Sequence, residues 1–110
     1  MDLDIIDLRQ RLAPAEGFGP VWTQSSDDLN VNLLRFAAGQ GVPAHRNDEV
    51  DVLVLALEGT GVVEVDGTPH AIGAGQLCLI PKGLTRSIRS AGGSFAYVTC
   101  HRRRGGLMPV

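Results

Sequence analysis

Several residues that could do chemistry lie close together in one short stretch, AHRNDEVDVLVLALEGTG, at residues 44–61. The stretch has the frame of a metal-binding motif, in which His45 could supply the first ligand. Asn47 and Val52, however, stand where such a motif would place a second histidine and a glutamate. Because a divalent transition metal needs three or more convergent N, O or S donors, two interpretations stay open. The chain is either a metalloenzyme with unusual ligands or a scaffold that holds no metal.

The elements that must position these residues have the pattern of short β-strands. Strand character runs through residues 3–8, 20–24, 29–37, 51–58, 62–66, 76–80, 84–89 and 94–102. Glycines and prolines separate the segments at the spacing of about 8–12 residues that is typical of a β-sandwich or barrel. The pair Asp66–Gly67 predicts a tight hairpin turn, and the only helical signal is a single turn near residues 8–12. A length of 110 residues predicts one all-β domain over residues 1–110.

Charge and hydropathy limit the partners that we expect for this protein. The formal net charge is −2, with all 12 acidic residues in residues 1–66 and six basic residues in residues 67–110. We expect the two halves to interleave and neutralise each other, and the HRRR run at residues 101–104 is too short to predict nucleic-acid binding. No apolar run approaches the length of about 18 residues that a membrane helix needs. The acidic N-terminus does not resemble a secretory signal, so we expect a cytoplasmic protein.

Two segments of the sequence resemble the two motifs of the cupin superfamily. The first runs from Gly41 to Gly59, and the hairpin sequence EGTGVVEVDG follows from residue 58. The second is GQLCLIPKGLTRSIRS at residues 75–90, in which Gly75, Pro81 and Gly83 have the spacing of the family motif. The resemblance covers about residues 30–100 and implies a cupin-type jelly-roll β-barrel. Three segments are also similar to short bacterial cupin-like proteins, and this likeness implies no particular reaction. They are EVDVLVLALEGTG, IPKGLTR and CHRRRGGLMP.

The resemblance implies a degenerate metal site. Cupins bind their metal through the two histidines of a His-x-His pair, a glutamate, and a histidine of the second motif. Of these positions, His45 fills the first, Asn47 the second and Val52 the third, with Asp51 one residue away, and Arg86 stands at the fourth. One ligand of four remains, and a guanidinium is a permanent cation. We therefore expect no metal cofactor; if a metal is bound at all, His45 is its one retained ligand.

The same positions predict a different kind of pocket at the mouth of the barrel. If residues 45, 47 and 86 keep their cupin orientation, the pocket holds an imidazole, a carboxamide and a guanidinium, with Val52 in its wall and Asp51 beside it. A guanidinium binds carboxylate or phosphate through its forked donors. The sequence therefore predicts that the protein binds a small, anionic molecule without a transition metal, with Arg86 directed toward the space shared by His45 and Asn47.

Three alternatives to this interpretation stay open at the level of sequence. Arg86 could pair with Asp51 or Glu49 and serve only the structure. The protein could be an isomerase or lyase in which His45 is the general base and Arg86 holds a substrate carboxylate. A β-bulge that turns Asp51 or Glu49 inward, or the arrival of His101 from the last strand, could rebuild a metal site.

The position of His101 depends on the orientation of the last strand. His101 joins the pocket if Phe95, Tyr97 and Thr99 face the interior, and it does not if the intervening residues do.

The strand predicted at residues 51–58 is apolar on both faces. Val52, Val54 and Ala56 would line one face and Leu53, Leu55 and Leu57 the other. A sheet with one face in water should instead alternate apolar and polar side chains. The opposite sheet or a second copy of the chain must cover the second face, and we expect a homodimer.

Overall fold

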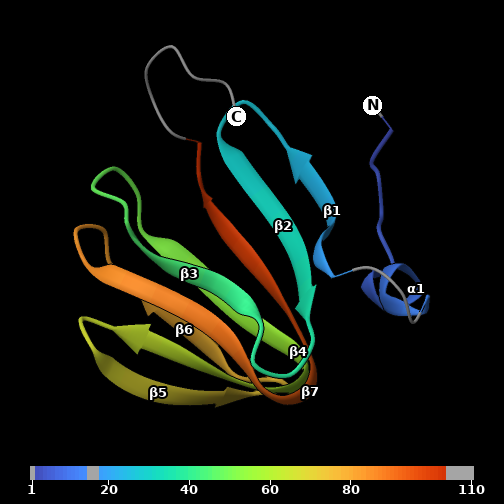
Figure 1. Ribbon diagram of the computed structural model, residues 1–110. Coiled ribbons are helices and arrows are strands. Elements are labelled where there is room, and N and C mark those ends of the chain that lie inside the picture. Colours follow the sequence, from blue (N-terminus) through green and yellow to red (C-terminus); the bar gives the residue numbers. More distant parts are fainter. Residues whose placement is uncertain (1, 15–17, 104–110) are drawn as a thin grey trace.

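The computed structural model describes residues 2–14 and 18–103, which form one short helix and seven strands (Figure 1). In chain order the elements are α1 (Leu8–Leu12), β1 (Gly19–Ser25), β2 (Leu29–Phe36), β3 (Gly41–Arg46), β4 (Val52–Val65), β5 (Thr68–Gly73), β6 (Leu77–Ile80) and β7 (Thr85–Arg102). The expected all-β class is confirmed, as is the single helical turn near residues 8–12. Within the described ranges, no helix has the length and apolar character that crossing a membrane requires.

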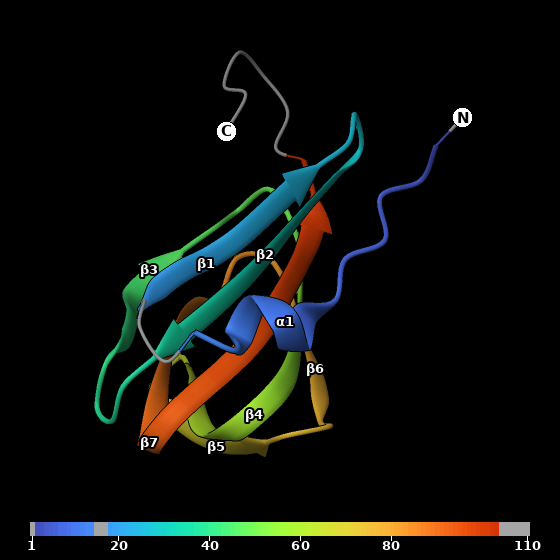
Figure 2. The same cartoon turned by 90° about the vertical axis from the view of Figure 1, so that its right-hand side faces the viewer.

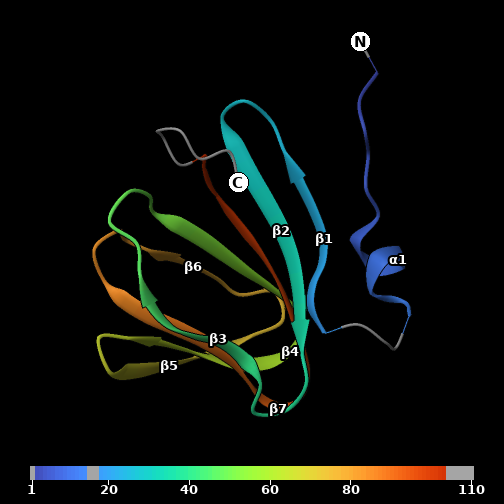
Figure 3. The ribbon, with the colours of Figure 1, turned by 45° about the horizontal axis from the view of Figure 1, so that its top comes forward.

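The long strands β4 and β7 are bent, and each contributes to both of two antiparallel sheets. The first half of β4 and the second half of β7 pair with each other in one sheet, whose order is β1–β2–β7–β4–β6. The other halves pair in the second sheet, whose order is β3–β7–β4–β5. Figure 3 shows β1 and β2 on one side of the molecule and β3 and β5 on the other. The two sheets therefore form a sandwich joined by its two longest strands.

Glycines make the bends of β4 and β7 possible. Gly59 in β4 and Gly93 in β7 have φ values of +74° and +69°, a region of backbone conformation that favours glycine. A Cβ atom at Gly59 would lie 2.0 Å from the carbonyl oxygen of Ser94 on β7. The sequence pattern predicts that these glycines end strands, and this prediction is wrong. Segments 51–58 and 62–66 are one strand, and so are 84–89 and 94–102, because a glycine bends a strand without ending its pairing.

The ends of the other elements show what the sequence pattern predicts well and where it fails. The Asp66–Gly67 hairpin is confirmed, with φ values of +47° and +83° at its two residues. The strand expected at residues 3–8 is wrong. The carboxylate of Asp7 accepts hydrogen bonds from the backbone N–H groups of Arg9 (3.0 Å) and Gln10 (3.2 Å), and so caps α1. Residues 2–7 have no regular structure, and the N-terminal end of this segment runs away from the sheets (Figure 2). The pattern also omits β3 and β5, in which prolines reduce the strand signal.

The principal core lies between the two sheets. Its buried residues are Val50, Val52, Val54, Ala56, Val63, Ile72, Ile80, Ile88, Phe95 and Tyr97. Val52, Val54 and Ala56 of β4 belong to this core, so the inward face predicted for this strand is confirmed.

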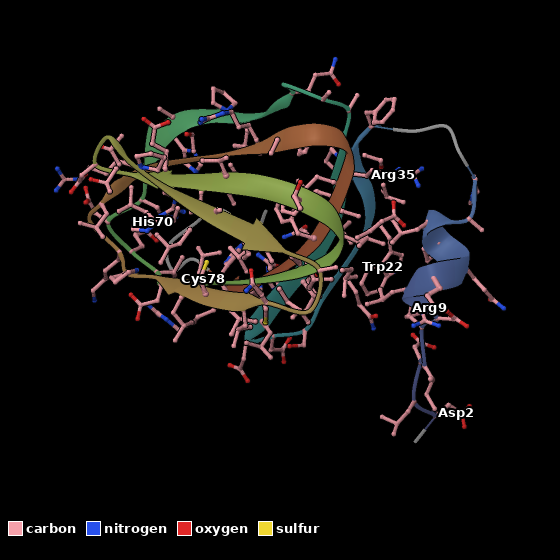
Figure 4. All side chains as sticks on the ribbon, turned by 90° about the horizontal axis from the view of Figure 1, so that it is seen from below. Asp2, Arg9, Trp22, Arg35, His70 and Cys78 are labelled. Carbon is pink, nitrogen blue, oxygen red and sulfur yellow. The ribbon has the colours of Figure 1, made fainter. Side chains whose placement is uncertain are left out.

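A second cluster covers part of the outer face of the β1–β2–β7–β4–β6 sheet. There Leu12 of α1 packs with Leu33, Ala96 and Val98, and Leu55 and Leu57 of β4 adjoin them. Arg35 of β2 holds α1 in place by donating hydrogen bonds to the carbonyl oxygens of Leu12 (2.6 Å) and Pro14 (2.5 Å). Figure 4 shows Arg35 and Trp22 on the side of the sheets that faces α1. The second face of β4 is thus covered in part by the same chain.

Candidate functional site

The candidate site is a cavity of about 180 Å³ between the two sheets. Its lining residues are Pro20, Asn32, Leu34, Val42, His45, Val52, Ile80, Arg86, Ile88, Tyr97, Thr99 and His101. Four of the six residues that the sequence proposes for a pocket, His45, Val52, Arg86 and His101, meet here. Polar groups converge on a partly apolar wall, which is the usual composition of a small-ligand site.

His45 and Arg86 are brought together by the pairing of β3 with β7. They are direct partners in the register of this antiparallel pair, so their side chains lie on the same face of the sheet. Val42 and His45 of β3 both line the cavity, although residues three apart in a regular strand lie on opposite faces. A register shift between Val42 and His45 explains this arrangement. Regular alternation would turn one of them outward, and the extra residue of a β-bulge restores the inward direction.

His101 enters the cavity because of the orientation of the last part of β7. Tyr97, Thr99 and His101 all line the cavity, and they lie opposite Leu34, Asn32 and Asn30 of β2. The first of the two orientations considered for the sequence is therefore the one that the chain adopts. Thr99 and Asn32 are joined by a hydrogen bond of 3.3 Å from the Asn32 Nδ2 group to the Thr99 hydroxyl oxygen.

Tyr97 is buried completely, and its ring lies between two phenylalanines. The ring centroids are 5.1 Å from that of Phe95 and 6.2 Å from that of Phe36, with interplanar angles of 28° in both pairs. The hydroxyl group is buried and makes no hydrogen bond to any part of the chain that the structure describes. Burial raises the pKa of Tyr97 well above its usual value, so the hydroxyl stays protonated and remains a donor. A buried donor without an acceptor is costly, and a bound ligand would supply one.

Arg86 places a permanent positive charge in the same wall. The residue is only 5% exposed, and its pairing with Val65 on one side and His45 on the other embeds it in the second sheet. Among residues 2–14 and 18–103, no group of three or more His, Cys, Asp or Glu side chains is arranged to hold a metal ion. The side chains at this position therefore do not fit a transition metal.

Asn47 and Asp51 are not brought into the cavity, and here the expectation from sequence is wrong. The Asn47 side-chain oxygen accepts hydrogen bonds from the backbone N–H groups of Glu49 (2.7 Å) and Val50 (3.2 Å), which stabilises the turn after β3. The Asp51 carboxylate accepts from the Lys82 N–H group at 2.9 Å. Asp51 and Glu49 are exposed and line a groove on the outside of the molecule, so neither turns inward. Short polar side chains in loops satisfy nearby backbone groups in this way.

The sequence-based proposal omits three polar members of the cavity: Tyr97, Thr99 and Asn32. A signal for the first two was present in the alternation of residues 95, 97, 99 and 101, but the inward set could not be chosen from it. Asn32 lies in a strand with no other chemical signal, and only its pairing with Thr99 across β2 and β7 reveals its position.

Comparisons with known proteins define the class of this protein. The family model for the Cupin domain matches residues 32–100. The chain belongs to the cupin family, and it is a small cupin domain protein, as the two sequence motifs suggest.

Solved structures confirm the fold. Protein TT1209 from Thermus thermophilus superimposes with a TM-score of 0.78 at 22% identity, over 94% of this chain and 100% of that one. Protein NMB1881 from Neisseria meningitidis gives a TM-score of 0.77 at 22% identity, over 91% and 100%. An RmlC-like cupin with a double-stranded β-helix fold from Methanocaldococcus jannaschii gives 0.66 at 14% identity, over 74% and 75%. The expected cupin-type jelly-roll barrel is thus confirmed, while identities this low show the fold alone.

One curated relative has a named activity. Dimethylsulfoniopropionate lyase DddW from Ruegeria pomeroyi is 37% identical to this chain over 54 residues. The match spans 49% of this chain and 35% of that protein. The chain therefore spans about a third of the length of the curated relative that it matches.

Proposed function

We propose that the cavity binds a small carboxylate or another small anion without a transition metal. The observation that carries this proposal is that Tyr97, whose buried hydroxyl has no acceptor in the described parts of the chain, lines the same cavity as the buried residue Arg86. A carboxylate has two oxygens and several lone pairs. It would accept from the guanidinium and from the hydroxyl together, and so satisfy a donor that is otherwise buried without a partner.

The size of the cavity limits the ligand. Water occupies about 30 Å³ per molecule in the liquid, so a volume of about 180 Å³ has room for roughly six water molecules or a ligand with a similar number of heavy atoms. Pockets for drug-sized ligands are several times larger. A short-chain carboxylate or a phosphate ion therefore fits within the cavity, and a larger ligand would extend out of it.

The side chains in the cavity favour an anion over a metal cation. His45 and His101 are the two metal-ligating side chains of the cavity, and the fixed charge of Arg86 would repel a cation placed between them. The same charge attracts an anion, and the low polarity around Val52 and Ile88 strengthens that attraction.

A lyase that acts on a small carboxylate is the second candidate. Two observations favour it: the similarity to a protein named as a lyase of a substituted propionate, and the position of His45 opposite Arg86. In such an enzyme, Arg86 would hold the carboxylate while His45 takes a proton as general base. Consumption of dimethylsulfoniopropionate, followed by NMR and abolished in a His45→Gln variant, would support this candidate over simple binding.

The melting temperature of the protein in the presence of small anions tests the principal proposal. We expect acetate, propionate or phosphate at millimolar concentration to raise it, because a ligand that binds only the folded state stabilises that state. The variant Arg86→Met keeps a long side chain but loses the charge, and we expect it to lose the response to anions.

Arg89 provides a matched control on the same strand. It is exposed and forms an ion pair of 3.0 Å with Glu64 outside the cavity, so Arg89→Met should keep the full response. If anions leave the unaltered protein unchanged, or if both variants respond equally, the proposal is wrong and Arg86 serves the structure only.

A further inference from the structure

The two histidines of the cavity are held in one defined tautomer. His45 Nδ1 lies 3.0 Å from the carbonyl oxygen of Pro43, and His101 Nδ1 lies 2.8 Å from the carbonyl oxygen of Arg102. A carbonyl oxygen only accepts hydrogen bonds, so each Nδ1 atom carries the hydrogen. In the neutral ring the lone pair then lies on Nε2. Both histidines thus offer a hydrogen-bond acceptor to a ligand.

The other polar groups of the cavity present donors, because the Asn32 side-chain oxygen already accepts from the Thr23 hydroxyl at 2.8 Å. Arg86 and Tyr97 carry N–H and O–H groups and, at any ordinary pH, cannot lose them. The Thr99 oxygen already accepts from Asn32, which leaves its own hydrogen to donate. The cavity therefore presents two kinds of surface. Donors lie along the buried wall, and acceptors lie at His45, which is exposed, and at His101, which is half-buried.

This division of donors and acceptors specifies more of the ligand than its charge. A simple carboxylate would use the donors and leave both Nε2 atoms to water. We propose, on the basis of the function proposed above, that the ligand is a short hydroxy acid. Its carboxylate accepts from Arg86 and Tyr97, and its hydroxyl group donates to Nε2 of His45 or His101. A three-carbon hydroxy acid has six heavy atoms, which agrees with the estimate of roughly six from the cavity volume.

Matched ligands test this inference by calorimetry or by thermal shift at mildly alkaline pH. Lactate and isobutyrate differ only in a hydroxyl group against a methyl group, and 3-hydroxypropionate and butyrate form a second such pair. We expect one of the hydroxy acids to bind about 10-fold more tightly than its methyl counterpart, the value of one good hydrogen bond. The methyl ether of that hydroxy acid can accept but not donate, and it should lose the advantage.

Variants of the histidines locate the contact. His45→Phe or His101→Phe should abolish the preference for the hydroxyl group, so that each hydroxy acid binds no more tightly than its methyl counterpart. His70→Phe is the matched control, because His70 is exposed on β5 (Figure 4) and is not among the residues that line the cavity. Equal binding of the hydroxy acids and their methyl counterparts would overturn this inference and leave the anion site intact. A preference that persists in both histidine variants would also overturn it. If no carboxylate binds at all, the proposed function fails, and this inference fails with it.

Discussion

The Tyr97 hydroxyl differs from the other polar groups of the cavity in its surroundings. Asn32, Thr99 and both histidines each make hydrogen bonds within the chain, whereas the Tyr97 hydroxyl makes none in the described ranges. Its ring nevertheless packs tightly between Phe36 and Phe95. The apolar part of this residue therefore stabilises the core, while its polar atom opposes folding unless a ligand is present.

Removal of that hydroxyl group should consequently stabilise the protein without ligand. We expect Tyr97→Phe to raise the free energy of unfolding by about 1 kcal/mol at neutral pH, since a buried donor without a partner costs roughly 1–3 kcal/mol. Urea denaturation measures this change. The same variant should respond more weakly to small carboxylates. A loss of stability in Tyr97→Phe would show that the hydroxyl has a partner and would contradict the role given to it here.

The pH dependence of this effect has a definite sign. Because burial raises the pKa of Tyr97, the unfolded chain loses the phenol proton at a lower pH than the folded protein does. The contribution of Tyr97 to stability is therefore constant below the usual phenol value near 10 and is lost as the pH rises above it. The difference in free energy of unfolding between Tyr97→Phe and the unaltered protein should thus increase above about pH 10.

At the scale of elements, the paired strands β3 and β7 decide which side chains share the cavity. The bulge in β3 turns His45 inward opposite Arg86, and β4 places Val52 in the same cavity. Asn47 lies beyond the end of β3, where it stabilises a turn. A metal site could thus be built on this scaffold only from the positions that the strands direct inward, and position 47 is not one of them.

This geometry predicts how metal affinity can be created. The unaltered protein should purify without a stoichiometric transition metal. The double variant Val52→Glu, Arg86→His should bind zinc or nickel, because it would place a carboxylate and an imidazole beside His45 and His101 and would remove the positive charge. Elemental analysis measures the metal content of the unaltered protein, and calorimetry measures the metal affinity of the double variant.

The single variant Asn47→His serves as the control for that experiment, since its side chain lies at a turn outside the cavity. It should lose stability without gaining affinity for a metal. One equivalent of metal in the unaltered protein, lost in a His45→Ala variant, would contradict the assignment of a metal-free cavity.

At the scale of the whole molecule, the outer face of the β1–β2–β7–β4–β6 sheet is only partly covered. α1 packs over the part near Leu57, but on β6 Leu77 and Leu79 remain 57% and 65% exposed. They pair in register with Leu55 and Leu53 of β4, so the apolar surface continues across two strands. A contiguous apolar surface of this kind is typical of a contact between proteins.

We therefore propose that the protein forms a homodimer through this face. Light scattering at micromolar concentration should give twice the mass of the chain, and Leu79→Lys should give the monomer, because a charge there cannot be buried without a partner. Leu3→Lys, which is also exposed but lies in the N-terminal segment away from the sheet, is the control and should stay dimeric. A monomeric mass for the unaltered protein would exclude this proposal.

The sequence by itself determined the class of fold and part of the site. Glycine spacing, the Asp66–Gly67 turn and alternating apolar residues are local features, and local backbone preferences are enough to produce strands, turns and an apolar inward face of β4. The two motif segments also proposed His45, Val52 and Arg86 for one pocket, and these three residues line one cavity. These positions follow a short-range pattern of strand and turn that the family shares.

Only the tertiary structure decided which polar side chains meet. The inward direction of His101 and Tyr97 depends on which face of β7 the other sheet covers, and alternation alone is symmetric between the two faces. The bulge that turns His45 inward changes the alternation within one strand, and the register of the pairing with β7 places it between Val42 and His45. Asn47 and Asp51 were misplaced because a side chain in a loop forms the nearest hydrogen bond available, and that partner exists only once the chain has folded.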